Sequence, residues 1–255
     1  MASNNRKLAL AGIIGTIVYA VADLFLYLGT DIASDSKLSL WQVPEWRLMT
    51  SMWIGAIGSF LLLLGFISLA GMYGAVFKKA GKFLILPAFL CIGGVLYMHF
   101  TLGVYAPLTY NSAVKAGVTA EQFSDLLANA ENYMNPLTIV LVILGYSTEI
   151  VLIFGILSGK FGLKKRLVSF MFGGYALVVL VFALIAKLTG EYGILGSVES
   201  LLEMTFFIPA YIYWRKEERN DRYCCSFTDR MHRFLPADIR CHGDFAVAKT
   251  YQFFP

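Results

Sequence analysis

The sequence predicts an all-α fold, a polytopic membrane helical bundle with six transmembrane helices. The first reason is composition: 58% of the 255 residues are hydrophobic and only 15% are charged, which is too apolar for a soluble chain of this length. The second is that the apolar residues gather into long runs separated by short polar loops. The third is that Lys and Arg concentrate in alternate loops, as the positive-inside rule requires.

A helix needs about 20 apolar residues to cross the hydrocarbon core of a bilayer. Six segments meet that length, and the predicted spans cover residues 7–28, 48–76, 83–105, 136–158, 167–187 and 195–214. The first follows Arg6 and Lys7 as a secretory signal would, but its apolar run is about twice as long as that of a signal peptide and no small-residue cleavage motif follows it. The sixth span carries two Glu residues, so we expect its insertion to depend on the other helices.

Charged residues in the loops predict the orientation. One set of loops carries nine basic residues and no acid: Arg6, Lys7, Lys78, Lys79, Lys82, Lys160, Lys164, Lys165 and Arg166. The alternate loops carry four basic and seven acidic residues. We therefore expect a multi-pass protein of the cell (cytoplasmic) membrane with both termini cytoplasmic. The basic residues are too dispersed to bind nucleic acid, so the expected partner is the lipid bilayer, and the sequence leaves the oligomeric state open.

The long outer loop between spans three and four predicts a short amphipathic helix. Thr119 and Gln122 have the spacing of a capping box. An apolar stripe follows at i, i+3, i+4 and i+7, formed by Phe123, Leu126, Leu127 and Ala130. We expect this helix to lie flat on the outer face, either as a fixed cover or as a mobile lid.

Two segments of different character make up the chain. We expect residues 1–218 to form the six-span transmembrane domain and residues 219–255 to form a cytoplasmic tail of poor order. The tail has clustered cysteines and no helical apolar stripe, which also fits a non-native extension. Because the cysteines lie in a span or in this tail, we expect reduced thiols and no disulfide framework.

The candidate functional residues are polar groups inside the spans. A charged residue at the centre of a spanning helix costs roughly 2.5–3.5 kcal/mol, and such residues usually face the bundle interior and mark function. Counting about 1.5 Å per residue places Asp23, His99, Glu199 and Glu203 in the outer half and Glu149 near the midplane. If these residues converge, they form an outward-facing acidic pocket, whose candidate ligand-binding residues are Glu203, Glu149, Asp23, Glu199, His99, Tyr19 and Tyr146.

Structural explanations remain open for three of these residues. Asp23 could pair with Arg47, Glu199 could be solvated at the interface, and His99 could be a hydrogen-bonded packing residue. Glu149 and Glu203 are harder to explain in this way, because no Lys or Arg lies within a span at their depth.

The search for sequence motifs of enzymes was negative. The chain lacks HExxH, G-x-S-x-G, a P-loop and a strand-associated G-x-G-x-x-G, so we expect no cofactor and no metal, and a familiar enzyme class is not indicated. The leading hypothesis is binding or transport of a small cationic or amphiphilic molecule. The alternatives are an integral-membrane enzyme that uses His99 and the carboxylates, or a structural or sensory bundle without a pocket.

Residues 12–74 contain two stretches that are similar to those of a known protein family. The first span reads Y-A-V-A-D-L-F-L-Y and the second span begins with W-R-L-M-T-S-M-W. This stretch resembles an uncharacterised family of six-span bacterial integral membrane proteins, and the resemblance covers residues 5–215. It implies a bacterial cytoplasmic-membrane location and brings no activity with it.

Overall fold

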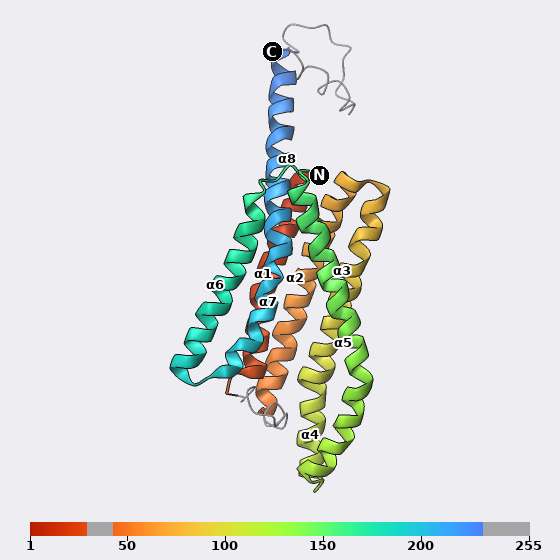
Figure 1. Ribbon diagram of the computed structural model, residues 1–255, viewed down its shortest axis with the longest axis vertical. Coiled ribbons are helices and arrows are strands. Elements are labelled where there is room, and N and C mark those ends of the chain that lie inside the picture. Colours follow the sequence, from red (N-terminus) through yellow and green to blue (C-terminus); the bar gives the residue numbers. More distant parts are fainter. Residues whose placement is uncertain (30–42, 232–255) are drawn as a thin grey trace. The chain divides into compact units, whose positions relative to one another are not determined.

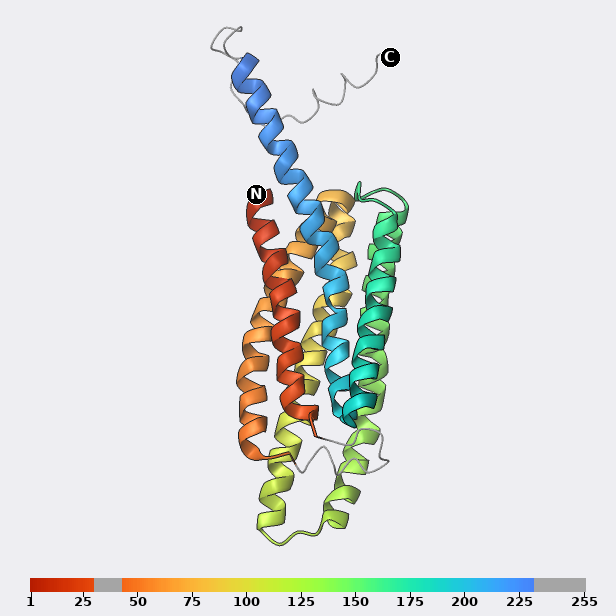
Figure 2. The same cartoon turned by 90° about the vertical axis from the view of Figure 1, so that its left-hand side faces the viewer.

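A computed structural model describes residues 1–29 and 43–231 of the chain. Within its helices, the side chains of some residues in 79–145, of Glu199 and of residues 222–231 lie outside the description. The described residues form helices joined by turns and short loops, and they contain no strand. The helices are α1 (Ala2–Tyr27), α2 (Glu45–Phe77), α3 (Lys79–Met98), η2 (His99–Tyr105), α4 (Ala106–Lys115), α5 (Ala120–Leu157), α6 (Arg166–Thr189), η3 (Tyr192–Ser197), α7 (Val198–Leu202) and α8 (Met204–Met231). Figures 1 and 2 show the long helices running alongside one another.

The chain divides into two compact units, Met1–Arg215 and Lys216–Pro255. The first unit contains the helical bundle described below. In the second unit the described residues are the end of α8, up to Met231. The predicted tail lies in this second unit, and residues 232–255 fall outside the described residues, so its predicted character stays a prediction.

Five helical segments among the described residues are long and apolar enough to cross a membrane: Ala2–Tyr27, Glu45–Phe77, Ile139–Leu157, Arg166–Thr189 and Tyr192–Asp221. They correspond to the first, second, fourth, fifth and sixth predicted spans. The third predicted span, residues 83–105, falls on α3 and η2, which are helical. Its membrane crossing stays a prediction.

The predicted short helix in the outer loop was wrong in its extent. The capping box itself is confirmed, because Thr119 Oγ1 accepts from the Gln122 N–H and Gln122 Oε1 accepts from the Thr119 N–H. The helix that it begins does not end before the fourth span but continues as α5, 38 residues long, through Pro136. Residues 120–144 contain no glycine that would end the helix, and proline is tolerated within membrane helices. Of the predicted stripe, Phe123 packs on Tyr110 of α4, with ring centroids 5.2 Å apart.

The sixth predicted span is a broken helix. It begins as the 3₁₀ segment η3, continues as the five-residue α7, and is interrupted at Glu203 before α8 begins. The Glu203 carbonyl accepts from the Phe206 N–H at 3.1 Å, a tight turn at the break. The break therefore falls at Glu203 and not at Pro209, which lies inside α8.

Among the helices that the structure describes, α1 and α2 make the most extensive contact. A methyl group built on Gly65 of α2 would lie 2.6 Å from the Cα of Gly12 on α1 and 2.6 Å from a ring carbon of Phe207 on α8. A methyl group on Gly15 would lie 2.8 Å from the backbone nitrogen of Leu62. Small residues at these positions therefore allow the backbones of the two helices to approach closely within one chain.

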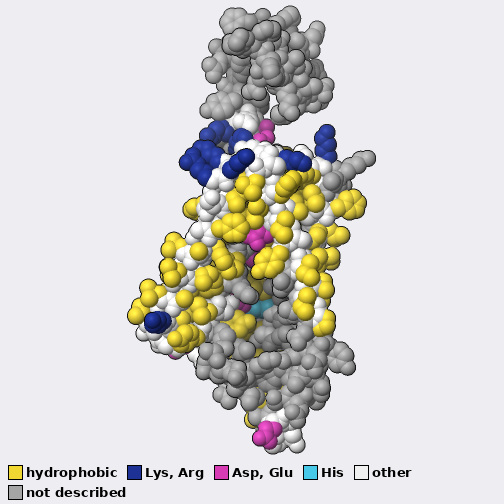
Figure 3. Space-filling view, in the orientation of Figure 1, with side chains coloured by type: hydrophobic (Ala, Val, Ile, Leu, Met, Phe, Trp, Pro, Cys, Tyr) yellow, Lys and Arg dark blue, Asp and Glu magenta, His cyan; other side chains and the backbone are white. Residues whose placement is uncertain are grey.

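Aromatic residues fill the end of the bundle where α2 finishes. Tyr73 stacks on Phe161, from the loop between α5 and α6, with ring centroids 5.6 Å apart. Trp214 donates its indole N–H to the Ser68 carbonyl at 3.1 Å. Lys and Arg side chains gather near this end on the face shown in Figure 3. At the same end, Lys160 lies over the ring of Phe77, with Nζ 5.3 Å from the ring centroid.

Candidate functional site

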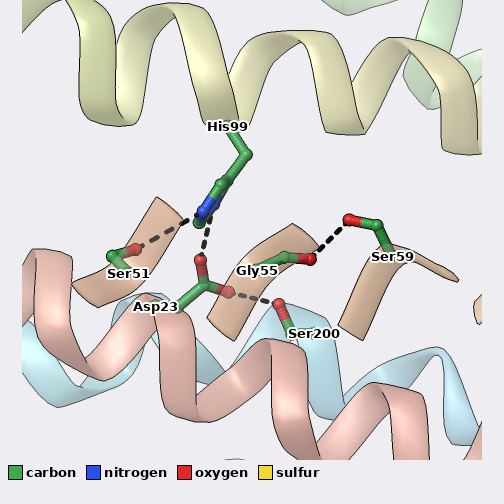
Figure 4. A network of polar contacts seen from close by, with 6 residues as sticks. All are labelled: Asp23, Ser51, Gly55, Ser59, His99 and Ser200. Carbon is green, nitrogen blue, oxygen red and sulfur yellow. Dashed lines mark hydrogen bonds and ion pairs between the residues drawn. The ribbon is translucent and has the colours of Figure 1, made fainter. Parts of the chain in front are cut away.

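Asp23 is the centre of a buried polar cluster at the opposite end of α2. It lies one turn before the end of α1 and is 5% exposed. Its Oδ1 is 3.0 Å from Nδ1 of His99, and its Oδ2 accepts a hydrogen bond from the Ser200 hydroxyl of α7. Figure 4 shows these contacts. Both carboxylate oxygens are therefore held, as a buried acid requires.

His99 connects Asp23 to α2. It is the first residue of the π-helical segment η2 and is 8% exposed. Its Nε2 lies 3.5 Å from the hydroxyl of Ser51, which is fully buried. A methyl group on Gly55, one turn after Ser51, would lie 2.9 Å from the same nitrogen. The glycine thus leaves room for the imidazole, and four helical segments meet in one hydrogen-bonded chain (Figure 4).

Two further polar groups beside this cluster have no partner. The ring of Tyr19 packs against the imidazole of His99, with centroids 4.8 Å apart and planes 47° from parallel. The Tyr19 hydroxyl and Oε2 of Glu203 are buried and have no hydrogen-bond partner among the described residues. The Tyr19 hydroxyl lies within range of the charges of both Asp23 and Glu203. A buried polar group without a partner calls for an explanation, such as a bound water, ion or ligand.

Asp23 does not pair with Arg47, the structural alternative considered above. The Arg47 guanidinium donates instead to the carbonyls of Phe25 and Leu28, with Nε 2.9 Å from the Phe25 oxygen. These carbonyls belong to the last turn of α1, where the helix leaves them without internal partners and where a positive charge is favourable. Arg47 therefore caps α1, and His99 and Ser200 are the partners of Asp23.

Tyr146 and Glu149, two other predicted pocket residues, lie away from the cluster. Tyr146 is 63% exposed. Glu149 is half-buried and follows Thr148, whose carbonyl accepts from the Tyr73 hydroxyl at 3.2 Å. Tyr73 is 22 residues after Ser51 on α2, a distance of about 33 Å along the helix. Glu149 thus lies far from Asp23. The side chain of Glu199 lies outside the described residues.

Sequence reasoning did not identify Ser51, Gly55 and Ser200 as parts of the site. Ser51 and Gly55 are four residues apart, a spacing of small residues that is typical of helix packing. Ser200 lies between the two acids of the sixth span, Glu199 and Glu203. The sequence did contain a pattern that could have indicated the two serines. Hydroxyl-bearing residues in spans that also contain or adjoin an acid are suitable hydrogen-bond partners for that acid.

The groups of the cluster can exchange protons and can accept hydrogen bonds from a donor. Two acids, one imidazole and three hydroxyls come together, and Asp23 and Glu203 lie within range of each other's charge. No group of three or more His, Cys, Asp or Glu side chains suited to hold a metal occurs among the residues that the structure describes.

Comparison with known proteins places the chain in a family but gives it no activity. No curated protein and no solved structure matches it. A family model matches residues 1–217, which include every residue of the cluster, whereas residues 218–255 lie outside the match. The chain belongs to a family of unknown function, DUF6796.

Proposed function

We propose that this protein is a six-span protein of the bacterial cytoplasmic membrane that binds or transports a small cationic or amphiphilic molecule at the Asp23–His99–Glu203 cluster. Five segments suited to cross a membrane support the membrane part of this proposal. The buried carboxyl group of Glu203 supports the cationic part, because an intramembrane acid without a basic partner favours positive charge beside it.

The observation that carries the proposal is the pair of unpartnered groups, the Tyr19 hydroxyl and Glu203 Oε2. Leaving a buried acceptor unsatisfied costs about 1–3 kcal/mol. An ammonium or another N–H donor between these groups would remove that cost. The ring of Tyr19 would also offer a cation its negative face, an interaction that strengthens when water is excluded.

The local backbone also supports a binding site. Glu203 lies at a break between two helices, and transporters often build substrate sites at broken membrane helices. His99 begins a π-helical segment, and such segments are frequent at functional sites.

The distribution of charge supports an outward-facing site with both termini cytoplasmic. Asp23 lies near the end of α1 and Ser51 near the start of α2, so the cluster lies far from the N-terminus and from the loop that joins α2 to α3. The predicted cytoplasmic loops carry the excess of Lys and Arg. A solute would then approach the cluster from the outer side.

The test uses the full chain in lipid nanodiscs and a panel of organic ammonium compounds, each paired with a neutral analogue of the same shape. We expect some ammonium compounds to raise the unfolding temperature while their neutral analogues do not. At 100 times Kd, the stabilisation should be about 2.7 kcal/mol. Glu203→Gln should abolish this response.

Glu149→Gln is the matched control, because it also replaces an acid of an apolar helix by its amide but lies far from the cluster. It should keep the response. Equal responses in both variants, or no stabilisation by any compound of the panel, would contradict the proposal and favour a structural bundle.

A further inference from the structure

Ser51, His99 and Asp23 are connected in the order of a nucleophile, a base and an orienting carboxylate. Nε2 of His99 faces the Ser51 hydroxyl and Nδ1 faces Asp23. A Ser–His–Asp constellation is recognised by these geometric roles, and its members come in no fixed chain order. The absence of a G-x-S-x-G motif therefore does not exclude it.

The contacts of Asp23 decide the tautomer of His99. An ionised carboxylate can only accept hydrogen bonds, so the imidazole proton belongs on Nδ1, 3.0 Å from Oδ1. Nε2 of the neutral ring then carries a lone pair toward Ser51. The distance of 3.5 Å is long for a hydrogen bond, as is common before a substrate tightens a catalytic contact. Ser200 holds the second oxygen of Asp23 and so fixes the carboxylate.

The unpartnered hydroxyl of Tyr19 has a role in the same chemistry. Its ring packs against the imidazole, and its O–H has no acceptor among the described residues. A tyrosine hydroxyl that is free to donate can stabilise the negative oxygen of a tetrahedral intermediate.

We propose that this cluster is an acyl-transfer site that hydrolyses a carboxylic ester of an uncharged or cationic amphiphile. The apolar helices around Ser51 suit an acyl chain, and Glu203 disfavours an anionic substrate and helps to release an anionic acid. Because Ser51 is fully buried, the ester reaches it only through a local opening of the bundle that keeps His99 beside Ser51. This inference goes beyond the proposed binding function, which does not need Ser51.

The reaction has two balanced steps. Ser51 Oγ attacks the carbonyl carbon and its proton passes to His99 Nε2; the ester C–O bond then breaks, and the alcohol leaves with that proton. In the second step a water attacks the acyl-serine and gives a proton to Nε2. The acid is released, and Nε2 returns the proton to Ser51. Ser51, His99 and Tyr19 are the catalytic residues, and Asp23 and Ser200 are positioning residues.

The test uses the full chain in nanodiscs and alkyl fluorophosphonates of several chain lengths, which trap an activated serine. We expect one adduct by intact mass, located on Ser51 by peptide mapping. Ser51→Ala should remove the adduct. Ser59→Ala is the matched control, because Ser59 lies on the same helix and donates to the Gly55 carbonyl, and it should be labelled like the parent.

The variants separate a catalytic from a structural role. Tyr19→Phe should slow labelling by about 10²–10³-fold, and Asp23→Asn should slow it by up to about 10⁴-fold. Labelling of His99→Ala should be restored in part by added imidazole, which a structural role of His99 does not predict. Circular dichroism and unfolding temperature verify that each variant is folded.

Two results would overturn the acyl-transfer proposal: no adduct on Ser51 in the folded parent protein with any chain length, or an equal labelling rate after His99→Ala. Neither result concerns the solute response of Glu203→Gln described above. Failure of catalysis and failure of solute binding are therefore distinguishable.

Discussion

Gly65→Ala tests the close crossing of α1, α2 and α8, which holds Tyr19 and Asp23 in position. The new methyl would lie 2.6 Å from the Cα of Gly12 and 2.6 Å from a ring carbon of Phe207. Carbon atoms pack at about 3.5–4.0 Å, so the helices must separate by roughly 1 Å. Overpacking of this kind costs about 1–3 kcal/mol, whereas alanine in place of glycine adds about 0.5–1 kcal/mol of helix stability. The expected net loss is about 0–2.5 kcal/mol.

The matched control is Gly74→Ala on the same helix, where a methyl group meets nothing within 4 Å. This variant should gain only the helix stability that alanine adds in place of glycine, about 0.5–1 kcal/mol. It should therefore be more stable than the parent. The measurement is reversible unfolding in mixed micelles, with the two variants compared side by side. If Gly65→Ala were as stable as Gly74→Ala, the close approach of α1 and α2 described above would be wrong.

Three further predictions concern other parts of the bundle. Thr119→Ala removes the side-chain cap of α5 and should cost about 0.5–2 kcal/mol, seen as faster amide exchange in the first turn of α5; unchanged exchange would contradict the cap. Tyr73→Phe removes the hydrogen bond to the Thr148 carbonyl and should lower the free energy of unfolding by about 0.5–1.5 kcal/mol, whereas equal stability would show that the bond is not formed. Gly55→Ala should displace the imidazole of His99 and shift its ¹⁵N resonances, and identical spectra would contradict the predicted contact.

The sequence was a good guide to the helices because apolar runs of fixed length and local capping signals do not depend on tertiary contacts. The α6 helix, Arg166–Thr189, differs from the predicted fifth span by one residue at its start and two at its end. The capping box at Thr119 is a local pattern of two side chains, and it was found. Whether α5 continues through Pro136 depends on a balance between the one backbone hydrogen bond that proline removes and the packing of the helix on both sides of it. Local sequence patterns do not contain that packing.

The partners in the candidate site were harder to predict for a different reason. Counting residues gives the depth of a side chain in the membrane but not the direction in which the helix turns it. Arg47 and His99 were both candidates to meet Asp23, and the crossing of α1 with α2 and η2 decides between them. Tyr146 was placed near the pocket by depth, yet α5 turns it outward, where it is 63% exposed.

The central claim is that Asp23 and His99 interact directly inside the bundle, and a double-mutant cycle tests it most directly. The cycle compares the free energies of unfolding of Asp23→Asn, His99→Gln and the double variant with that of the parent. Hydrogen bonds to charged groups contribute about 1.5–3 kcal/mol, so we expect a coupling energy of that size. The control cycle, His99→Gln with Glu149→Gln, should be additive within about 0.5 kcal/mol. A coupling energy between Asp23 and His99 as small as that of the control would contradict the account.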